Sequence, residues 1–261
     1  MSRRRTRQAN ALKPAPIGLL ALGLQRSRAI VVGLLPVLAM VAVTRVALAE
    51  AYHIPSGSME PTLLVGDWLF VNKLRFGPHI PFTNVSLPGY ATPARGDVVV
   101  FESPPQHPSI RISPDQVTPT LVKRIVGVGG DTLAMRRGRL MVNGVADSVV
   151  GTLGISPIAE QPQPIFEWQH RIATSSLGLG DAPKAPSLHE WGPLVVPAGT
   201  YFMMGDNRDN SVDSRFYGPV PRRNLRGTPT FVYYSFDATE GVEYVRAVTE
   251  IRWRRLGTWI R

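Results

Sequence analysis

The pattern of apolar and polar positions separates one apolar segment near the N-terminus from a long region of short, strand-like stretches. Residues 29–49 form a run of 21 mostly apolar positions, and a helix needs about 20 such residues to cross a bilayer. Pro36 is compatible with a spanning helix, and the long side chain of Arg45 can carry its charge to the headgroups. The pattern therefore predicts a transmembrane anchor at 29–49.

Several stretches beyond residue 50 combine β-branched or aromatic residues with flanking Gly, Pro, Asp or Asn, which is typical of strands. They are 67–74, 97–103, 120–128, 138–144, 200–205, 228–236 and 250–256. The pair Asn143-Gly144 predicts a tight hairpin turn. No helical period persists beyond the anchor. We therefore expect a mainly β fold, an antiparallel β-sheet core with a smaller inserted, β/loop-rich region, preceded by one N-terminal transmembrane helix.

Composition suggests how the chain is divided. Residues 1–28 are basic, and 29–49 are the anchor. The stretch 134–197 contains a long part rich in Pro, Gly, Ser and Ala, which predicts an inserted secondary domain. This leaves 51–133 and 198–261 as two halves of one β core.

The distribution of charge predicts the orientation of the anchor. Seven Lys and Arg residues precede the apolar run, whereas Glu50 and His53 follow it. The positive-inside rule then leaves the N-terminus in the cytoplasm and the rest outside, as a single-pass protein of the inner (plasma) membrane. Ala47-Leu48-Ala49 also fits a signal-peptide cleavage site, but the long basic flank and Arg45 favour an anchor.

The overall charge and the absence of cysteine exclude several function classes. The net charge is +10, much of it at the two ends of the chain. No zinc-finger, helix-turn-helix or RNA-binding fingerprint accompanies it, so we expect no nucleic-acid partner. The chain has no cysteine, which excludes disulfides, cysteine nucleophiles and thiolate metal sites.

Four motifs carry the candidate chemistry. They are YHIPSGSMEPTL at 52–63, RGDVVVFESP at 95–104, LVKRIVGVGGD at 121–131 and MGDNRDNSVDSRFYGPV at 204–220. In this order, behind an N-terminal anchor, they resemble bacterial type I signal peptidases of peptidase family S26. The resemblance covers most of 50–235. It implies a membrane-anchored serine endopeptidase that removes signal peptides from exported preproteins, cutting after small residues at positions −1 and −3.

The resemblance makes Ser58 the nucleophile and Lys123 its base. A serine hydroxyl needs a partner that takes its proton, and a lysine can do so only when it is neutral. The pKa of a solvated lysine is about 10.4, but burial can lower it by about 3–5 units. Leu121, Val122 and Ile125 supply aliphatic surroundings, and strand alternation turns Arg124 to the other face.

Further roles also follow from the resemblance. Ser56 is expected to donate to the oxyanion, and Ser211 to orient the lysine amine. Asp213 and Arg215 are expected to brace the site from below, while Ile54 and Val122 line the shallow substrate pockets. A separate hypothesis places Phe76, Ile80 and Phe82 against the membrane, since the segment 75–90 is apolar and rich in turns.

Other chemistries fit the sequence less well. The oxygen-rich stretch from Asp206 to Asp213 has Ser211 where an EF-hand requires glycine, so we expect no metal and no cofactor. Alternation points His53 away from Tyr52 and Ile54, which disfavours a Ser-His-Asp triad.

Expected partners are preproteins and the lipid bilayer, with the translocation machinery as a further candidate. The alternatives are a pilin-processing peptidase of conjugative transfer with the same fold, a self-cleaving repressor and a non-catalytic, membrane-tethered β module.

Overall fold

The computed structural model describes residues 30–37, 49–78, 87–111, 113–147, 161–175, 180–238 and 250–261. The chain forms two compact units, 1–44 and 45–261. In the first unit, residues 30–37 are helical. Within the described ranges, no helix combines the length and apolar character required to cross a membrane. The expected cytoplasmic segment 1–28 and most of the expected anchor, 29 and 38–48, lie outside those ranges.

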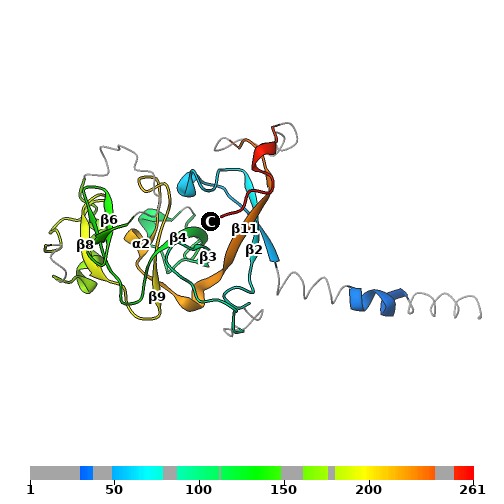
Figure 1. Ribbon diagram of the computed structural model, residues 1–261, viewed down its shortest axis with the longest axis horizontal. Helices are drawn as coiled ribbons and strands as arrows, with labels where there is room; N and C mark the ends of the chain where they lie inside the picture. The colour runs from blue at the N-terminus through cyan, green and yellow to red at the C-terminus, as the bar shows by residue number, and fades with distance from the viewer. Residues whose placement is uncertain are drawn as a thin grey trace, which may run out of the picture. The chain divides into compact units, whose positions relative to one another are not determined.

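The second unit is built around a large sheet whose neighbouring strands all pair antiparallel. In spatial order its strands are β1 (Ala49–His53), β2 (Asp67–Asn72), β11 (Leu225–Ser235), β3 (Val98–Glu102), β4 (Thr120–Val128), β9 (Thr200–Met204) and β10 (Val220–Pro221). β11 is the long strand that pairs with β2 along one part of its length and with β3 along another. Figure 1 shows β2 and β11 side by side, with β3 and β4 further along the sheet.

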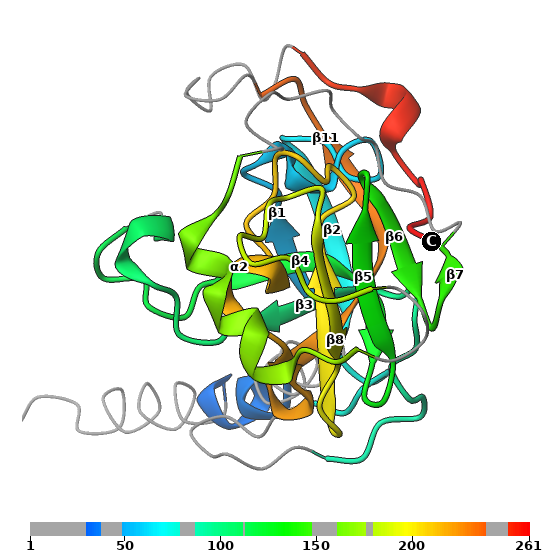
Figure 2. The ribbon, with the colours of Figure 1, turned by 90° about the vertical axis from the view of Figure 1, so that its left-hand side faces the viewer.

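A smaller antiparallel sheet is formed by strands that lie between β4 and β9 in the sequence. In spatial order they are β7 (Val145–Ala146), β6 (Arg139–Val142), β5 (Thr132–Arg136) and β8 (Trp191–Val195). The turn between β6 and β7 is the expected Asn143-Gly144 hairpin, with φ angles of 53° and 84°. Positive φ at both positions is what such a two-residue turn requires. Figure 2 shows β5, β6 and β8 together at the front of the view.

The helices of the second unit are short. They are the 3-10 helices η1 (Gly57–Met59), η2 (Pro108–Ile110), η4 (Pro164–Ile172), η5 (Arg222–Asn224) and η7 (Trp253–Arg255), and the α-helix α2 (Ser214–Tyr217). η4 packs against β8 and α2. The expected mainly β, antiparallel fold is therefore confirmed in outline. The division at 133/134 and 197/198 stays a prediction, and β5 spans the first of these boundaries.

The expectation of a strand at 250–256 was wrong. This segment makes an isolated bridge from Ile251 to Phe236 and then forms η7. Arginine side chains hold it in this shape, because Arg252 donates to the Val65 carbonyl at 2.8 Å and Arg255 pairs with Asp67. Arg252 and Arg255 therefore bind the segment between β1 and β2 and the start of β2, and do not form one face of a strand.

Several strands of the structure were not predicted from the sequence. β1 begins at Ala49, the last residue of the expected anchor. The strand was not recognised because it directly follows the apolar run. β5 is short and follows a glycine turn, and β8 contains Gly192-Pro193. Proline in a strand interior normally argues against a strand.

The core lies along both faces of the large sheet and between the two sheets. Val126, Phe202 and Met204 of the large sheet pack with Leu133 and Trp191 of the small one. The rings of Trp191 and Phe202 stack with centroids 5.5 Å apart. This shared apolar layer fixes the insertion against the strands that carry the candidate site.

The expectation that Phe76 faces the membrane was also wrong. Its side chain is 6% exposed and packs with Val99 and Phe101 in the core. Burial of an aromatic side chain of this size removes it from any surface contact. Ile80 and Phe82, the other members of that hypothesis, lie outside the described residues.

Candidate active site

The candidate nucleophile lies in the turn between β1 and β2. Ser58 is the middle residue of η1, and Met59 beside it is buried and anchors the turn in the core. Asn207 ties the turn down from the other side, because its backbone N–H donates to the Ser58 carbonyl and its Nδ2 to the Gly57 carbonyl, both at 3.1 Å. The turn is therefore held by the packing of Met59 on one side and by the hydrogen bonds of Asn207 on the other, and neither contact uses the Ser58 hydroxyl.

Lys123 brings its amine to this hydroxyl from the middle of β4. The distance from Lys123 Nζ to Ser58 Oγ is 2.6 Å, a short hydrogen bond. These residues lie 65 positions apart in the sequence and meet only because β4 passes beside η1. The two residues predicted as nucleophile and base are thus in direct contact.

The environment of Lys123 favours the neutral amine. The residue is 3% exposed, and burial lowers the pKa of the amine from 10.5 to about 8. The positive charge of Arg215 adds to this lowering, whereas the carboxylates of Asp213 and Asp206 oppose it. Desolvation is the largest of these effects because an ammonium ion loses its hydration when it is buried. A useful fraction of the amine is therefore neutral near neutral pH.

The other two serines of the prediction lie around the dyad. Ser56 is exposed and precedes η1, and its hydroxyl does not cap that helix. Ser56 and Ser58 line the same two cavities. Ser211 lines the second cavity, and its hydroxyl is buried and has no hydrogen-bond partner among the described residues. The expected bond from Ser211 to the lysine amine is not formed in this structure, so its orienting role stays a prediction.

Asp213 and Arg215 form a fully buried ion pair beneath the site. Arg215 donates from Nε and a terminal nitrogen to the two Asp213 oxygens, each at 2.8 Å. Asp213 also accepts the Gly205 N–H at 3.1 Å, and Arg215 donates to the Arg208 carbonyl at 2.5 Å. These bonds lower the pKa of the Asp213 carboxyl despite its burial, with Arg215 the main cause of the lowering. The pair is therefore bonded to the backbone of the loop 205–213, and its role as a brace of the site stays a prediction.

A second buried ion pair was not foreseen from the sequence. Arg124 donates to both oxygens of Asp206, at 2.8 and 2.6 Å, and Thr62 donates to the same carboxylate at 2.6 Å. This network joins β4, the turn after η1 and the loop that carries Asn207. From the sequence, Asp206 and Asn207 were considered only as possible metal ligands. Their contacts could not be read from sequence spacing, because their partners lie 82 to 150 positions away or are bonded through the backbone.

The acidic residues of this loop are all engaged with basic side chains. Asp206 binds Arg124, Asp213 binds Arg215, and Asp209 contacts His189 Nε2 at 2.8 Å. His53 stacks between Trp68 and Phe236, and its Nε2 has no hydrogen-bond partner among the described residues. Among the described residues, no histidine–carboxylate pair is bonded to Ser58, whose partner is Lys123.

A cavity of about 570 Å³ opens beside the dyad on the β1 side. The strand β1 and the residues after it form one wall, and 115–123 form the other. Ile54 and Val122, both expected to line substrate pockets, contribute to this lining and pack in the same apolar cluster. The arrangement can hold an extended peptide whose small side chains enter an apolar pocket next to a serine hydroxyl.

The family model described as signal peptidase, peptidase S26, matches residues 27–234. The signal peptidase I of Pseudomonas aeruginosa is 38% identical over 218 residues, which cover 77% of this chain and 70% of that protein. The enzyme of the same name from Aquifex aeolicus is 35% identical over 220 residues (72% and 77%). That of Haemophilus influenzae is 34% identical over 244 residues (78% and 68%). All four motifs lie inside the matched range.

Proposed function

The chain belongs to the signal peptidase I family (peptidase S26), and from this premise we propose that Ser58 and Lys123 are the catalytic dyad of its serine endopeptidase activity. The enzyme cleaves signal peptides, and its substrates are preproteins that carry them. The 2.6 Å approach of a buried lysine amine to a serine hydroxyl is the observation that carries the proposed dyad.

The proposed reaction needs no group beyond the dyad, water and an oxyanion donor. Ser58 Oγ attacks the scissile carbonyl carbon, and its proton passes to the neutral Lys123 amine. The resulting ammonium returns this proton to the leaving amine as the peptide bond breaks. A water molecule then attacks the acyl-enzyme ester, again giving its proton to Lys123, and the released Ser58 oxygen takes it back.

Ser56 is proposed to stabilise the oxyanion, together with the backbone N–H of Ser58. A hydroxyl that does not cap its helix and lines the same cavities as the nucleophile supports this role. Ser211 is proposed to orient the lysine amine. Its buried hydroxyl has no hydrogen-bond partner among the described residues, and the residue lines the same cavity as Lys123.

The signal-peptide side of the substrate is proposed to lie between β1 and β4. β1 is an edge strand of the large sheet. The first half of β4, up to Lys123, pairs only with β3 among the described strands, because its pairing with β9 begins at Arg124. Two strand edges therefore face the same cavity, and an extended peptide could hydrogen-bond to either. Ile54 and Val122 would then select small residues at −1 and −3.

We also propose the placement in the cell. Members of this family are membrane-bound. The apolar run 29–49, with seven basic residues before it, supports a single inner-membrane anchor with a cytoplasmic N-terminus and an extracytoplasmic catalytic unit. The translocation machinery, which delivers preproteins to that side, is the further proposed partner.

A preprotein cleavage assay on the full-length chain in detergent tests the dyad. Ser58→Ala and Lys123→Ala are each expected to abolish cleavage, and Ser56→Ala to lower the rate by about 100- to 1,000-fold. The variant Arg139→Glu, at an exposed position of β6, is the control and should cleave normally. Retained activity in Ser58→Ala or Lys123→Ala would overturn the assignment.

A further inference from the structure

A groove leads away from the dyad on the side opposite the proposed signal-peptide cavity. It begins with a cavity of about 310 Å³ that contains Ser58 and Lys123 and reaches Ile110 and Phe216. The same two residues line the next cavity, of about 670 Å³. This one in turn shares Phe216, Trp168 and Arg171 with a third cavity of about 490 Å³. The three cavities are therefore contiguous, and their common path runs from the catalytic centre onto η4.

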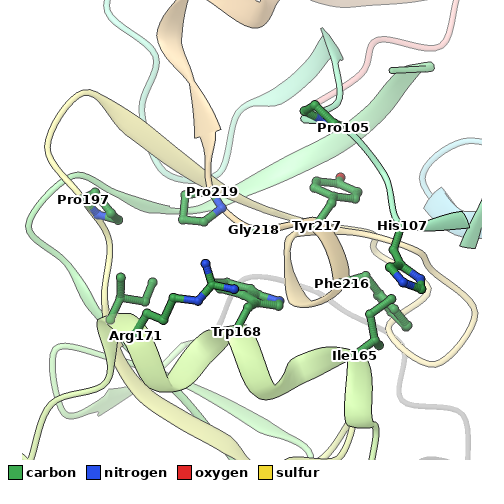
Figure 3. A pocket seen from close by; sticks show the side chains of 11 residues that line it. Pro105, His107, Ile165, Trp168, Arg171, Pro197, Phe216, Tyr217, Gly218 and Pro219 are labelled. Atoms are coloured by element: carbon green, nitrogen blue, oxygen red, sulfur yellow. The ribbon is translucent and has the colours of Figure 1, made fainter. Parts of the chain in front are cut away.

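The geometry of η4 explains which of its side chains line the outer two cavities. In a 3-10 helix, side chains three positions apart eclipse one another and form straight ridges. One ridge, Ile165, Trp168 and Arg171, lines the outer two cavities. The next ridge begins with the buried residues Phe166 and Gln169. Figure 3 shows the first ridge pointing from η4 towards Phe216 and Pro219 on the opposite wall, with His107 at one end.

The aromatic side chains of the groove are fixed before any ligand arrives. Trp168 Nε1 donates to the Arg215 carbonyl at 3.0 Å, so the indole is tied to the same residue that pairs with Asp213. Phe216 meets Phe166 edge-to-face, with ring centroids 4.8 Å apart. Rigid aromatic walls bind a ligand at a low cost in conformational entropy.

The charge of the outer groove has one sign. Among the described residues that line its two cavities, Arg171 is the one permanently charged side chain. No Asp or Glu lines them, and Glu167 lies on the exposed ridge of η4. Such a surface suits a large apolar or aromatic side chain that is accompanied by a carboxylate.

We infer that this groove binds the mature part of the preprotein, beyond the scissile bond, and prefers an aromatic residue followed by an acidic one. The inference rests on the proposed dyad, because a peptide whose signal segment fills the β1 side must leave past Ile110 and Phe216. The aromatic side chain packs between Trp168 and Phe216, and the acidic one pairs with Arg171. The insertion thereby contributes to substrate selection through KM, without touching the reacting atoms.

The experiment uses the full-length chain in detergent and peptides with one signal segment and one cleavage site. A Phe-Glu pair is moved residue by residue along a Gly-Ser mature segment, and a companion set carries Phe-Lys. We expect one or two adjacent positions of Phe-Glu to lower KM with kcat unchanged. Arg171→Glu should raise KM for that peptide by about fivefold, the size of an exposed ion pair and its reversal, and should prefer Phe-Lys instead. Arg139→Glu, at an exposed position outside the groove, should behave as wild type.

A peptide that ends shortly after the cut separates the two proposals. Wild type and Arg171→Glu should cleave it equally, and Ser58→Ala should not cleave it. If the short peptide behaves so but KM is independent of Phe-Glu position, or if Arg171→Glu does not reverse the charge preference, the groove proposal is wrong and the dyad stands. If Ser58→Ala cleaves the short peptide, the dyad itself is wrong.

Discussion

Two adjacent residues of β4 place buried cations on opposite faces of one strand, in environments of opposite character. Lys123 is 3% exposed and Arg124 is 6% exposed. The guanidinium of Arg124 binds the Asp206 carboxylate through two nitrogens and also donates to the Gly96 carbonyl at 2.7 Å. The amine of Lys123 meets a serine hydroxyl instead, with no carboxylate bonded to it among the described residues.

One strand can therefore hold one basic group that stabilises the fold and another that takes part in the reaction. A buried charge is tolerated when a partner of opposite sign is bonded to it. Without such a partner, the group relieves its burial by losing its proton, and lysine can do this whereas arginine cannot. The two side chains are separated simply because neighbouring residues of a strand point to opposite faces.

Replacement of Lys123 by arginine should have the largest effect on cleavage. Lys123→Arg keeps a cation beside Ser58 that cannot accept a proton at any physiological pH. We expect cleavage to fall by at least about 1,000-fold, within the range lost when a general base is removed. The measurement is kcat/KM on a preprotein. Arg124→Lys, which keeps a cation opposite Asp206, should retain activity within about tenfold. If Arg124→Lys lost activity and Lys123→Arg kept it, the proposed roles of the two residues would be wrong.

Removal of the paired cation should instead affect stability. Arg124→Met leaves the Asp206 carboxylate buried without its main partner, and breaking such a pair costs about 3–5 kcal/mol of unfolding free energy. Denaturant unfolding of the full-length chain, followed by tryptophan fluorescence, measures this loss. The double variant Arg124→Met with Asp206→Leu should recover much of the loss, because no uncompensated charge is then left in the interior.

Removal of Lys123, the cation without a bonded carboxylate, should raise the free energy of unfolding instead of lowering it. The pKa of Lys123 is lowered from 10.5 to about 8 in the folded chain, so the unfolded chain binds more protons between these values and stability rises with pH across that window. Below about pH 8 the full cost of burial is present. Lys123→Met should therefore be more stable than wild type at neutral pH, by about 3 kcal/mol from the size of the shift, and the difference should shrink towards pH 10.5. A variant that is less stable at every pH would contradict this account.

The sequence was sufficient for the parts of the fold and site that depend on local pattern. Strand alternation separated Lys123 from Arg124, and the Asn-Gly pair gave the turn at 143–144. The family motifs gave Ser58 and Lys123, which the structure brings into contact. Local pattern failed where tertiary contacts override it, as in the segment 250–256, where arginine side chains replace a strand ladder.

The sequence could not supply the contacts that hold the site in place. Asn207 braces the nucleophile turn through backbone carbonyls, which no residue pattern announces. Arg124 and Asp206 are 82 positions apart, and their pairing depends on how β4 and the loop 205–213 are packed. The groove along η4 was missed for the same reason, since its walls come from four separate parts of the chain.

The pH dependence of cleavage gives the smallest effect and bears most directly on the comparison. Only the neutral amine of Lys123 can accept the Ser58 proton, so kcat/KM should rise about tenfold per pH unit below the pKa and level off above about pH 8. The rise should be unchanged in His53→Phe, which keeps the aromatic contacts of His53 with Trp68 and Phe236. Burial lowers the pKa of the His53 imidazole from 6.5, so a rise centred below pH 6.5 that disappears in this variant would mean that His53 is the base. The distinction between the two faces of β4 would then have no role in catalysis.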